Sequence, residues 1–224
     1  MPADHIVLLF DIDGTLIDTG GAGAASWRLA FDELYGTPAD IGKYTDAGMT
    51  DSQVARQTFE AVVGHAPTHK ELASLLERRL NHLYATVAAS TGYRVLPGVE
   101  KLLPRLLEGG YLLGLVTGNG EAAAHIKLHR ARLNRFFSFG GYGSDSDDRS
   151  QLTRKALERA ALVFGAPVDP KRCLTVGDTP LDVAAAHRAG IECVGVASGH
   201  FSVEQLHQAD ADYVLESLED SLPL

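Results

Sequence analysis

Residues 6–20, IVLLFDIDGTLIDTG, constrain the fold of this chain more than any other segment. The apolar run from Ile6 to Phe10 ends on Asp11, and Asp13 follows two residues later. A short apolar run closed by turn residues is typical of a strand buried on both faces, as in a parallel sheet. Ligands of open parallel sheets bind beyond the carboxyl ends of the strands, where both carboxylates are expected. Such close carboxylates repel each other, and a bound divalent cation would explain them, although a simple turn remains the alternative for this segment alone.

Two later apolar runs end in a similar way. The run at 112–116 is followed by Thr117, and the run at 173–176 is followed by Gly177 and then Asp178. Helical patterns separate the apolar runs, which predicts an α/β fold, a doubly wound parallel sheet with helices on both faces. Since parallel strands end at one edge of a sheet, the polar residues after these runs are expected to meet there.

The remaining core elements are read from shorter patterns. A short strand is expected at 136–139, a polar, glycine-rich loop at 140–150, and an amphipathic helix at 152–164. Further strands are expected at 193–196 and 213–214.

The segment 19–95 shows helical patterns and no convincing strand. Thr50 and Thr68 are each followed three residues later by Gln or Glu, which predicts a capping box at the start of two helices. We therefore expect a Rossmann-like core of residues 1–18 and 96–224, with 19–95 forming a helical insertion after the first strand.

The charge of the chain limits its partners. The formal net charge is −9 and the pI about 5.4, which argues against non-specific binding to nucleic acid or to an anionic membrane surface. No run of about 20 apolar residues is present, and the first residues lack the pattern of a signal peptide. Cys173 and Cys193 stand beside predicted strands, where reduced, buried thiols are expected. We therefore expect a cytoplasmic protein.

Three segments together resemble the signatures of the haloacid dehalogenase-like hydrolases, in particular the phosphoglycolate phosphatase-like branch. They are DIDGT at 11–15, LVTGN at 115–119 and VGDTPLD at 176–182. The resemblance implies a magnesium-dependent phosphatase that hydrolyses a small phosphorylated metabolite through a phosphoaspartate. It also implies that 19–95 is a cap over the catalytic face, with Gly48–Asp51 facing the active site, although helix capping is the preferred explanation of Thr50 and Asp51.

The resemblance gives roles to the aspartates. Asp11 would be the nucleophile and Asp13 the general acid and base, chemistry that carboxyl groups can perform. Crowding by other carboxylates is expected to favour the protonated form of Asp13. Magnesium is expected to bind Asp11, Asp178 and the backbone carbonyl of Asp13. Asp182 is expected to support the water shell of the metal, and a favourable contact with its own helix dipole is the alternative.

Phosphate binding requires further donors. The Thr117 hydroxyl and the backbone N–H groups of Gly118 and Asn119 could hold phosphate oxygens, with a helix cap as the alternative. The lysine that is usual in this family before the next helix is absent. Arg149, in the loop expected before that helix, is the candidate cation, and a surface arginine is the alternative. Lys155, one turn into the helix, is expected to be a solvated surface residue.

Several other functions stay open. A phosphosugar mutase would use the same core, and a non-catalytic module could keep the fold to bind a phosphorylated ligand. The presence of Asp13 disfavours a dehalogenase, and a phosphonate hydrolase would need a cap lysine, for which nothing marks Lys43 or Lys70. His125 and His129 are expected to be solvated histidines on a helix face. The sequence leaves the substrate and the oligomeric state open.

Overall fold

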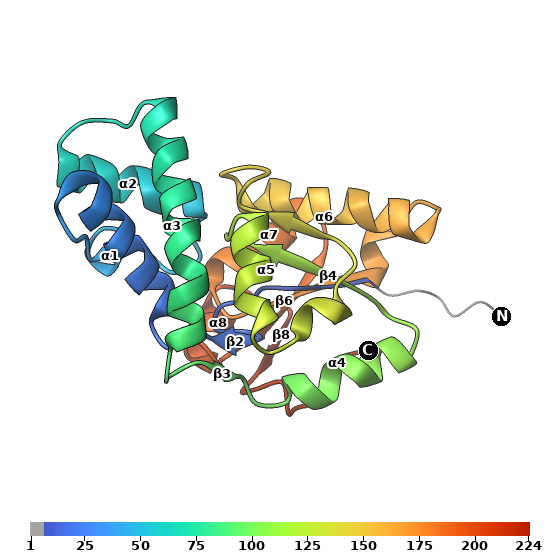
Figure 1. The fold of residues 1–224 in the computed structure, drawn as a ribbon. Coiled ribbons are helices and arrows are strands. Elements are labelled where there is room, and N and C mark those ends of the chain that lie inside the picture. The colour runs from blue at the N-terminus through green and yellow to red at the C-terminus, as the bar shows by residue number, and fades with distance from the viewer. Residues whose placement is uncertain (1–6) are drawn as a thin grey trace.

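The computed structural model describes residues 7–224 and contains a six-stranded parallel sheet in the order β5-β4-β1-β6-β7-β8 (Figure 1). The predicted doubly wound α/β fold is confirmed, while Ile6 of the expected first strand lies outside the described residues. The strands of this sheet are β1 (Val7–Phe10), β4 (Leu112–Thr117), β5 (Gly140–Tyr142), β6 (Cys173–Gly177), β7 (Glu192–Val196) and β8 (Tyr213–Leu215).

Strand β1 lies inside the sheet, and its alternate residues enter two separate apolar cores. Leu8 and Phe10 face one core, whereas Val7 and Leu9 face the other, as the two-residue period of a strand requires. Helices cover both cores, so all four side chains are buried. The covering helices are α4 (Val99–Glu108) and α5 (Glu121–His129) on the first core, and α6 (Arg149–Phe164) and α7 (Pro180–Ala189) on the second.

The strand expected at 136–139 is wrong, and so is the loop expected from residue 140. The strand β5 begins at Gly140, and the 3-10 helix η2 (Leu133–Phe136) takes part of the expected strand. A Cβ on Gly141 would lie 1.9 Å from the backbone oxygen of Leu152 in α6. The glycines therefore mark a helix packed tightly on a strand.

Three of the helices between β1 and β4 pack together beside the sheet (Figure 1). Trp27, Phe31, Phe59 and Leu75 belong to an apolar core that these helices share. We call this region, residues 22–89, the helical insertion. Its elements are α1 (Ala22–Tyr35), η1 (Ile41–Lys43), α2 (Asp51–Val63) and α3 (His69–Ala89).

Both capping boxes expected in the helical insertion are present. Thr50 accepts a hydrogen bond from the backbone N–H of Gln53 at the start of α2, and Thr68 does the same with Glu71 at the start of α3. These bonds fix where the two helices begin.

A strand pairing and a helix contact help to join the helical insertion to the core. Strand β2 (Ile17–Asp18) pairs antiparallel with β3 (Arg94–Val95), so the expectation of no strand within 19–95 is wrong at Arg94 and Val95. A strand of two residues is too short to show a sequence period. Leu83 and Val87 of α3 pack with Ala123 of α5. The insertion is thus held beside the carboxyl ends of the strands.

The remaining elements complete the core. They are η3 (Pro170–Arg172) and α8 (Val203–Gln208). Cys173 and Cys193 are buried free thiols, as expected. Among the helices of residues 7–224, none has the length and apolar character needed to cross a membrane.

Candidate active site

The pairing of β1 with both neighbours brings distant segments to one edge of the sheet. Phe10, the last residue of β1, lies opposite Leu115 of β4 and Val176 of β6. Asp11 and Asp178, which come shortly after these strand positions, therefore reach the same edge. Together with the helical insertion, this edge surrounds a cavity of about 650 Å³.

Three buried carboxylates lie together at this edge. Asp11, Asp178 and Asp182 each present an oxygen within 4.8 Å of the others, with exposed fractions of 6%, 2% and 4%. Burial and then repulsion from Asp182 raise the pKa of Asp11 to about 7. Burial, with repulsion from Asp182 and Asp11, raises the pKa of Asp178 to about 8. A cation among these carboxylates would offset their repulsion.

The groups around Asp178 fit a hard divalent cation, since all candidate ligand atoms are oxygens. Thr15 donates its hydroxyl to Oδ1 of Asp178 at 3.2 Å, which leaves Oδ2 for another partner. The backbone of Gly14 passes so close that a Cβ there would lie 2.3 Å from Oδ2 of Asp178. Gly14 also has a φ of +79°, a conformation that favours glycine. Asp178 is therefore held in place before any ion binds.

Arg149 lies beside these carboxylates, but on a helix and not in the predicted loop. It is the first residue of α6 and 5% exposed. Its guanidinium pairs with Asp182, lies 3.7 Å from Oδ2 of Asp11, and donates to the backbone oxygen of Gly48 at 2.8 Å. Burial works to lower the pKa of Arg149, yet Asp182 and Asp11 raise it above its ordinary value. The guanidinium is a fixed positive charge whose Nε has no partner.

Of the two roles considered for Asp182, the structure shows its place at the start of its own helix, and support of the water shell of a metal stays a prediction. Its Oδ2 accepts the backbone N–H of Thr179 at 3.0 Å and so completes the capping box that begins α7. Its Oδ1 contacts Arg149. Asp182 therefore caps a helix and at the same time orients the buried arginine.

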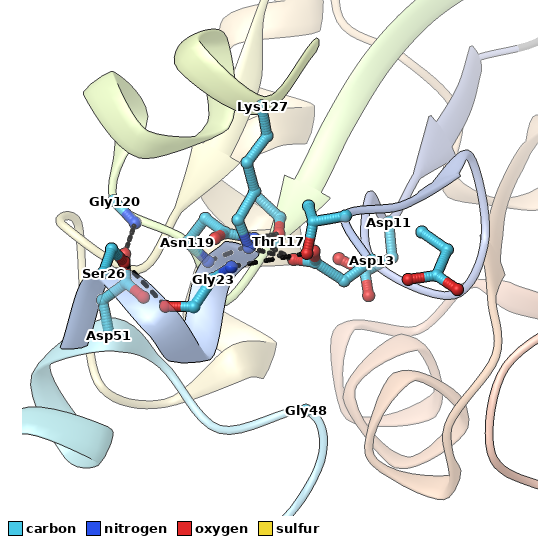
Figure 2. A network of polar contacts seen from close by, with 12 residues as sticks. Asp11, Asp13, Gly23, Ser26, Gly48, Asp51, Thr117, Asn119, Gly120 and Lys127 are labelled. Atoms are coloured by element: carbon cyan, nitrogen blue, oxygen red, sulfur yellow. Dashed lines mark hydrogen bonds and ion pairs between the residues drawn. The ribbon is translucent and has the colours of Figure 1, made fainter. Parts of the chain in front are cut away.

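Asp13 faces the cavity with a different set of partners (Figure 2). Its Oδ2 accepts from Nζ of Lys127 at 2.6 Å and from Nδ2 of Asn119 at 2.8 Å. Desolvation works to raise the pKa of Asp13, but Lys127 and Asn119 hold it below the ordinary value. The expectation that crowding would favour protonated Asp13 is therefore wrong for the free protein, because the nearest charge is a lysine and not another carboxylate.

The segment that follows β4 faces both the core and the helical insertion. Nδ2 of Asn119 also donates to the hydroxyl oxygen of Thr117 at 2.9 Å. The backbone N–H of Asp51 donates to the oxygen of Gly118 at 2.8 Å, and the N–H of Gly120 donates to Oδ2 of Asp51 at 2.8 Å (Figure 2). Asp51 therefore connects the insertion to the segment proposed to bind phosphate, a contact that helix capping alone does not explain.

Two charged residues of the cavity, Lys127 and Arg79, did not stand out in the sequence, whereas Asp51 was considered there as a helix cap that could face the active site. Lys127, Asp51 and Arg79 all line the cavity, and Arg79 pairs with Asp51 at 2.8 Å. The sequence around Lys127 or Arg79 indicates only a position on the face of a helix. The contacts of both residues in the cavity depend on partners far away in the chain.

Other candidates lie outside this cavity. Lys155 is exposed and pairs with Glu158, as expected of a surface residue. His129 is exposed, as expected, whereas the expectation of a solvated His125 is wrong, because His125 is half-buried against Asn134. Lys43 and Lys70 do not line the cavity either.

Comparison with known proteins gives a consistent family. The family model described as haloacid dehalogenase-like hydrolase matches residues 8–196. A phosphoglycolate phosphatase from Pseudomonas putida is 30% identical over 221 residues, which cover 97% of this chain and 78% of the relative. A solved hydrolase from Pseudomonas syringae has a TM-score of 0.74 at 26% identity, covering 96% of this chain and 95% of that one. A β-phosphoglucomutase from Clostridium difficile has a TM-score of 0.73 at 18% identity, covering 96% and 92%, and shows the shared fold alone.

Proposed function

The chain belongs to the haloacid dehalogenase-like hydrolases, and we propose that it is a magnesium-dependent phosphatase that hydrolyses a small phosphorylated metabolite through a phosphoaspartate. One observation carries this proposal. Asp11, Asp178 and Arg149 come from three distant segments and meet, buried, around one point at the edge of the cavity. Buried carboxylates repel each other and cost stability, so their assembly at a cavity points to chemistry.

The metal would be held by the carboxylates of Asp11 and Asp178 and by the backbone carbonyl of Asp13. When bound, it would neutralise charge on the phosphoryl oxygens and on the carboxylates. Asp182 supports this site by orienting Arg149.

The first half-reaction transfers the phosphoryl group to Asp11. A carboxylate oxygen of Asp11 attacks phosphorus, the bond to the leaving oxygen breaks, and that oxygen receives a proton from Asp13. In the free protein Asp13 is ionised beside Lys127. A phosphate dianion entering the cavity adds negative charge beside Asp13, which favours its protonated form.

The second half-reaction returns the free enzyme. Asp13, now ionised, takes a proton from a water molecule whose oxygen attacks phosphorus, and the bond from phosphorus to Asp11 breaks. The lowered pKa of Asp13 suits this step, because it keeps the base deprotonated at neutral pH.

Arg149 and Thr117 would hold the phosphoryl oxygens, with the backbone N–H groups of Gly118 and Asn119. The guanidinium of Arg149 is fixed by Asp182 before substrate arrives, so little orientation remains to be gained on binding. This arrangement replaces the lysine that is usual in the family.

We further propose that residues 19–95 act as the cap and that residues 1–18 and 96–224 act as the core. The contact from Arg149 to the backbone oxygen of Gly48 supports a cap that closes directly over the phosphate. We predict that the partner of the chain is a small phosphorylated molecule and neither a nucleic acid nor a membrane. We also predict a cytoplasmic location.

Hydrolysis of p-nitrophenyl phosphate tests the function. With Mg²⁺ the wild-type chain should release p-nitrophenol, EDTA should abolish the activity, and Asp11→Asn should lose about 10⁴-fold in kcat. Asp32→Asn, an exposed position on α1, is the control and should match the wild type. Equal activity of wild type and Asp11→Asn would refute the phosphoaspartate. Absence of activity in the wild type with Mg²⁺ would favour a non-catalytic ligand-binding module.

A further inference from the structure

The buried face of α5 carries a charged side chain. Ala123, Ala124 and Leu128 are fully buried on this face, and Lys127 lies among them with an exposed fraction of only 5%. A buried ammonium group costs free energy unless it is paired, so an apolar residue is the ordinary occupant of such a position. Lys155 of α6, in contrast, keeps its charge at the surface. The burial of Lys127 is therefore explained by what its ammonium group contacts.

The partner of Lys127 is the carboxyl group of Asp13. Nζ of Lys127 donates to Oδ2 of Asp13 at 2.6 Å, and Nδ2 of Asn119 donates to the same oxygen at 2.8 Å (Figure 2). The side chain of Lys127 is 7% exposed, whereas that of Asp13 is 42% exposed and lines the cavity. Two buried donors therefore hold one oxygen of Asp13 and leave the rest of the carboxyl group to the cavity.

The donors are themselves fixed. Nδ2 of Asn119 also donates to the hydroxyl oxygen of Thr117 at 2.9 Å, and the backbone oxygen of Lys127 accepts the hydroxyl of Tyr93 at 2.8 Å. The start of α1 lies against the ammonium group, because a Cβ on Gly23 would be 3.8 Å from Nζ of Lys127. The ammonium group thus has little freedom, and it transmits this restraint to Oδ2 of Asp13.

These contacts decide which oxygen of Asp13 can carry a proton. An ammonium group has three donors and no acceptor, and the amide nitrogen of Asn119 also only donates. A proton on Oδ2 would therefore face donors alone, whereas a proton on Oδ1 leaves both hydrogen bonds in place. Among residues 7–224, no donor contacts Oδ1. The proton of a neutral Asp13 accordingly belongs on Oδ1.

We infer that Lys127 is a positioning residue, which turns Oδ1 of Asp13 toward the leaving oxygen of the substrate. The inference rests on the proposed phosphatase function and names the residue that directs its proton transfer. As the bond from phosphorus to the leaving oxygen breaks, the O–H bond at Oδ1 breaks and the leaving oxygen takes that proton. Oδ1 recovers a proton from water in the second half-reaction. Lys127 stays bound to Oδ2 and neither gives nor takes a proton.

Two aryl phosphates of the same shape test this role. The p-nitrophenolate ion is stable and departs without a proton, whereas the more basic leaving group of phenyl phosphate depends on the acid. The measurement is the ratio of kcat/KM for p-nitrophenyl phosphate to kcat/KM for phenyl phosphate. Because kcat/KM covers the steps up to departure of the leaving group, hydrolysis of the phosphoaspartate does not enter the ratio. Lys127→Met should raise it about 10-fold, mainly by slowing phenyl phosphate.

Matched variants separate positioning from folding. Both esters are measured on one preparation, so a partial loss of folded protein cancels from the ratio. Lys127→Arg keeps a cationic donor and should restore part of the wild-type ratio, and Lys127→Gln keeps an amide donor if the methionine variant does not fold. Lys155→Met removes a surface lysine and should keep the wild-type ratio. Asp13→Asn should also raise the ratio, and adding Lys127→Met to it should raise it no further.

The other outcomes contradict the inference. An unchanged ratio in folded Lys127→Met would leave Lys127 as a structural partner of Asp13. A lower ratio would show that Lys127 acts only through its charge, by opposing the neutral form of Asp13. A further rise on the background of Asp13→Asn would place the action of Lys127 elsewhere, and a wild type that hydrolyses only p-nitrophenyl phosphate would show that no acid assists the leaving group. Failure of the wild type with both esters and Mg²⁺ would instead refute the proposed phosphatase.

Discussion

Arg149 and Arg79 are both buried guanidiniums that line one cavity, and each has an Nε without a partner. Their surroundings differ. Arg149 lies among Asp182, Asp11 and Asp178, whose charges raise its pKa, and its place is fixed by the core. Arg79 has one carboxylate partner, Asp51, and its place is fixed by the helical insertion. The first guanidinium is thus paired within the buried carboxylate cluster, and the second is paired within the insertion.

We expect the two regions to have different parts in the proposed reaction. The core would supply the carboxylates of Asp11 and Asp178 from the ends of strands and the guanidinium of Arg149 from the start of α6. The insertion supplies Arg79, Asp51 and Trp27 from helices with a core of their own. We therefore expect substitutions in the insertion that spare its contacts with Gly118, Gly120 and Arg149 to leave the carboxylate cluster in place.

Removal of Arg149 should have the largest effect and should not depend on the substrate. Arg149→Ala should lower kcat/KM by about 10²–10³-fold for every phosphate ester, because a fixed donor to the transferred group is lost. Steady-state kinetics with both carboxymethyl phosphate and p-nitrophenyl phosphate measure this loss. A loss confined to one ester would instead give Arg149 a role in substrate selection and contradict its proposed contact with the transferred phosphoryl group.

The controls for Arg149 separate charge from folding. Lys155→Ala should stay within about twofold of wild type, since Lys155 pairs only with Glu158 on the surface. Arg149→Lys should keep more activity than Arg149→Ala. Removing one partner of a buried ion pair costs about 3–5 kcal/mol of folding stability. Circular dichroism must therefore show that Arg149→Ala is folded before its kinetics are compared. A larger loss in Lys155→Ala would move the role to that lysine.

Gly118 lies where the two regions touch, and its substitution should affect both. A Cβ there would lie 2.5 Å from the backbone oxygen of Met49 and 3.1 Å from Nη1 of Arg149. Gly118→Ala should therefore displace the insertion from the phosphate segment and lower kcat/KM by about 10–100-fold. Gly42→Ala is the control, because the nearest atom to its Cβ would be 3.6 Å away. Wild-type kinetics in Gly118→Ala would show that close contact between the regions is unnecessary.

The smallest expected effect is a pH-dependent gain of stability from magnesium. The pKa values of about 7 for Asp11 and about 8 for Asp178 exceed the ordinary 3.8. The folded chain therefore binds more protons than the unfolded chain, and the stability that these protons give is lost as pH rises through 7 and 8. Magnesium binds the deprotonated carboxylates. It should raise Tm by several degrees more at pH 8.5 than at pH 5.5.

Differential scanning fluorimetry with Mg²⁺ or EDTA at the two pH values measures this gain. The pKa of Asp13 is lowered and lies below this pH range, so titration of Asp13 does not contribute to the difference in Tm between the two pH values. In a variant with both Asp11→Asn and Asp178→Asn, magnesium should have no effect at either pH. An equal magnesium shift at both pH values in the wild type would argue against these carboxylates as its ligands.

The sequence predicted the strands that carry the site because their signal is local. Each is a continuous apolar run closed by a polar residue, and parallel pairing then requires Asp11 and Asp178 to meet. The strand β5 was missed because its residues are Gly140, Gly141 and Tyr142. The close approach of α6 requires the two glycines, and a local sequence pattern carries no information about that approach.

The charged residues of the cavity were harder to predict than its carboxylates. Lys127 meets Asp13 across 114 positions of sequence, and nothing near either residue marks the pair. Arg78 and Arg79 are adjacent and chemically identical, yet one is on the surface and the other is buried. Which arginine turns inward depends on the rotation of α3 against α1 and on Asp51, and both are properties of the packed molecule.

The fixed position of Asp178 has a consequence for the choice of ion. Thr15 holds one of its oxygens, and the backbone passes so close at Gly14 and Gly199 that a Cβ would lie 2.3 Å and 1.8 Å from the other. The carboxylate has no room to swing outward around a larger sphere of ligands. Calcium needs longer bonds and more ligands than magnesium, so it would have to push two stretches of main chain apart. Discrimination between the two ions would then arise from the stiffness of the polypeptide around one oxygen, since both ions accept the same kinds of ligand.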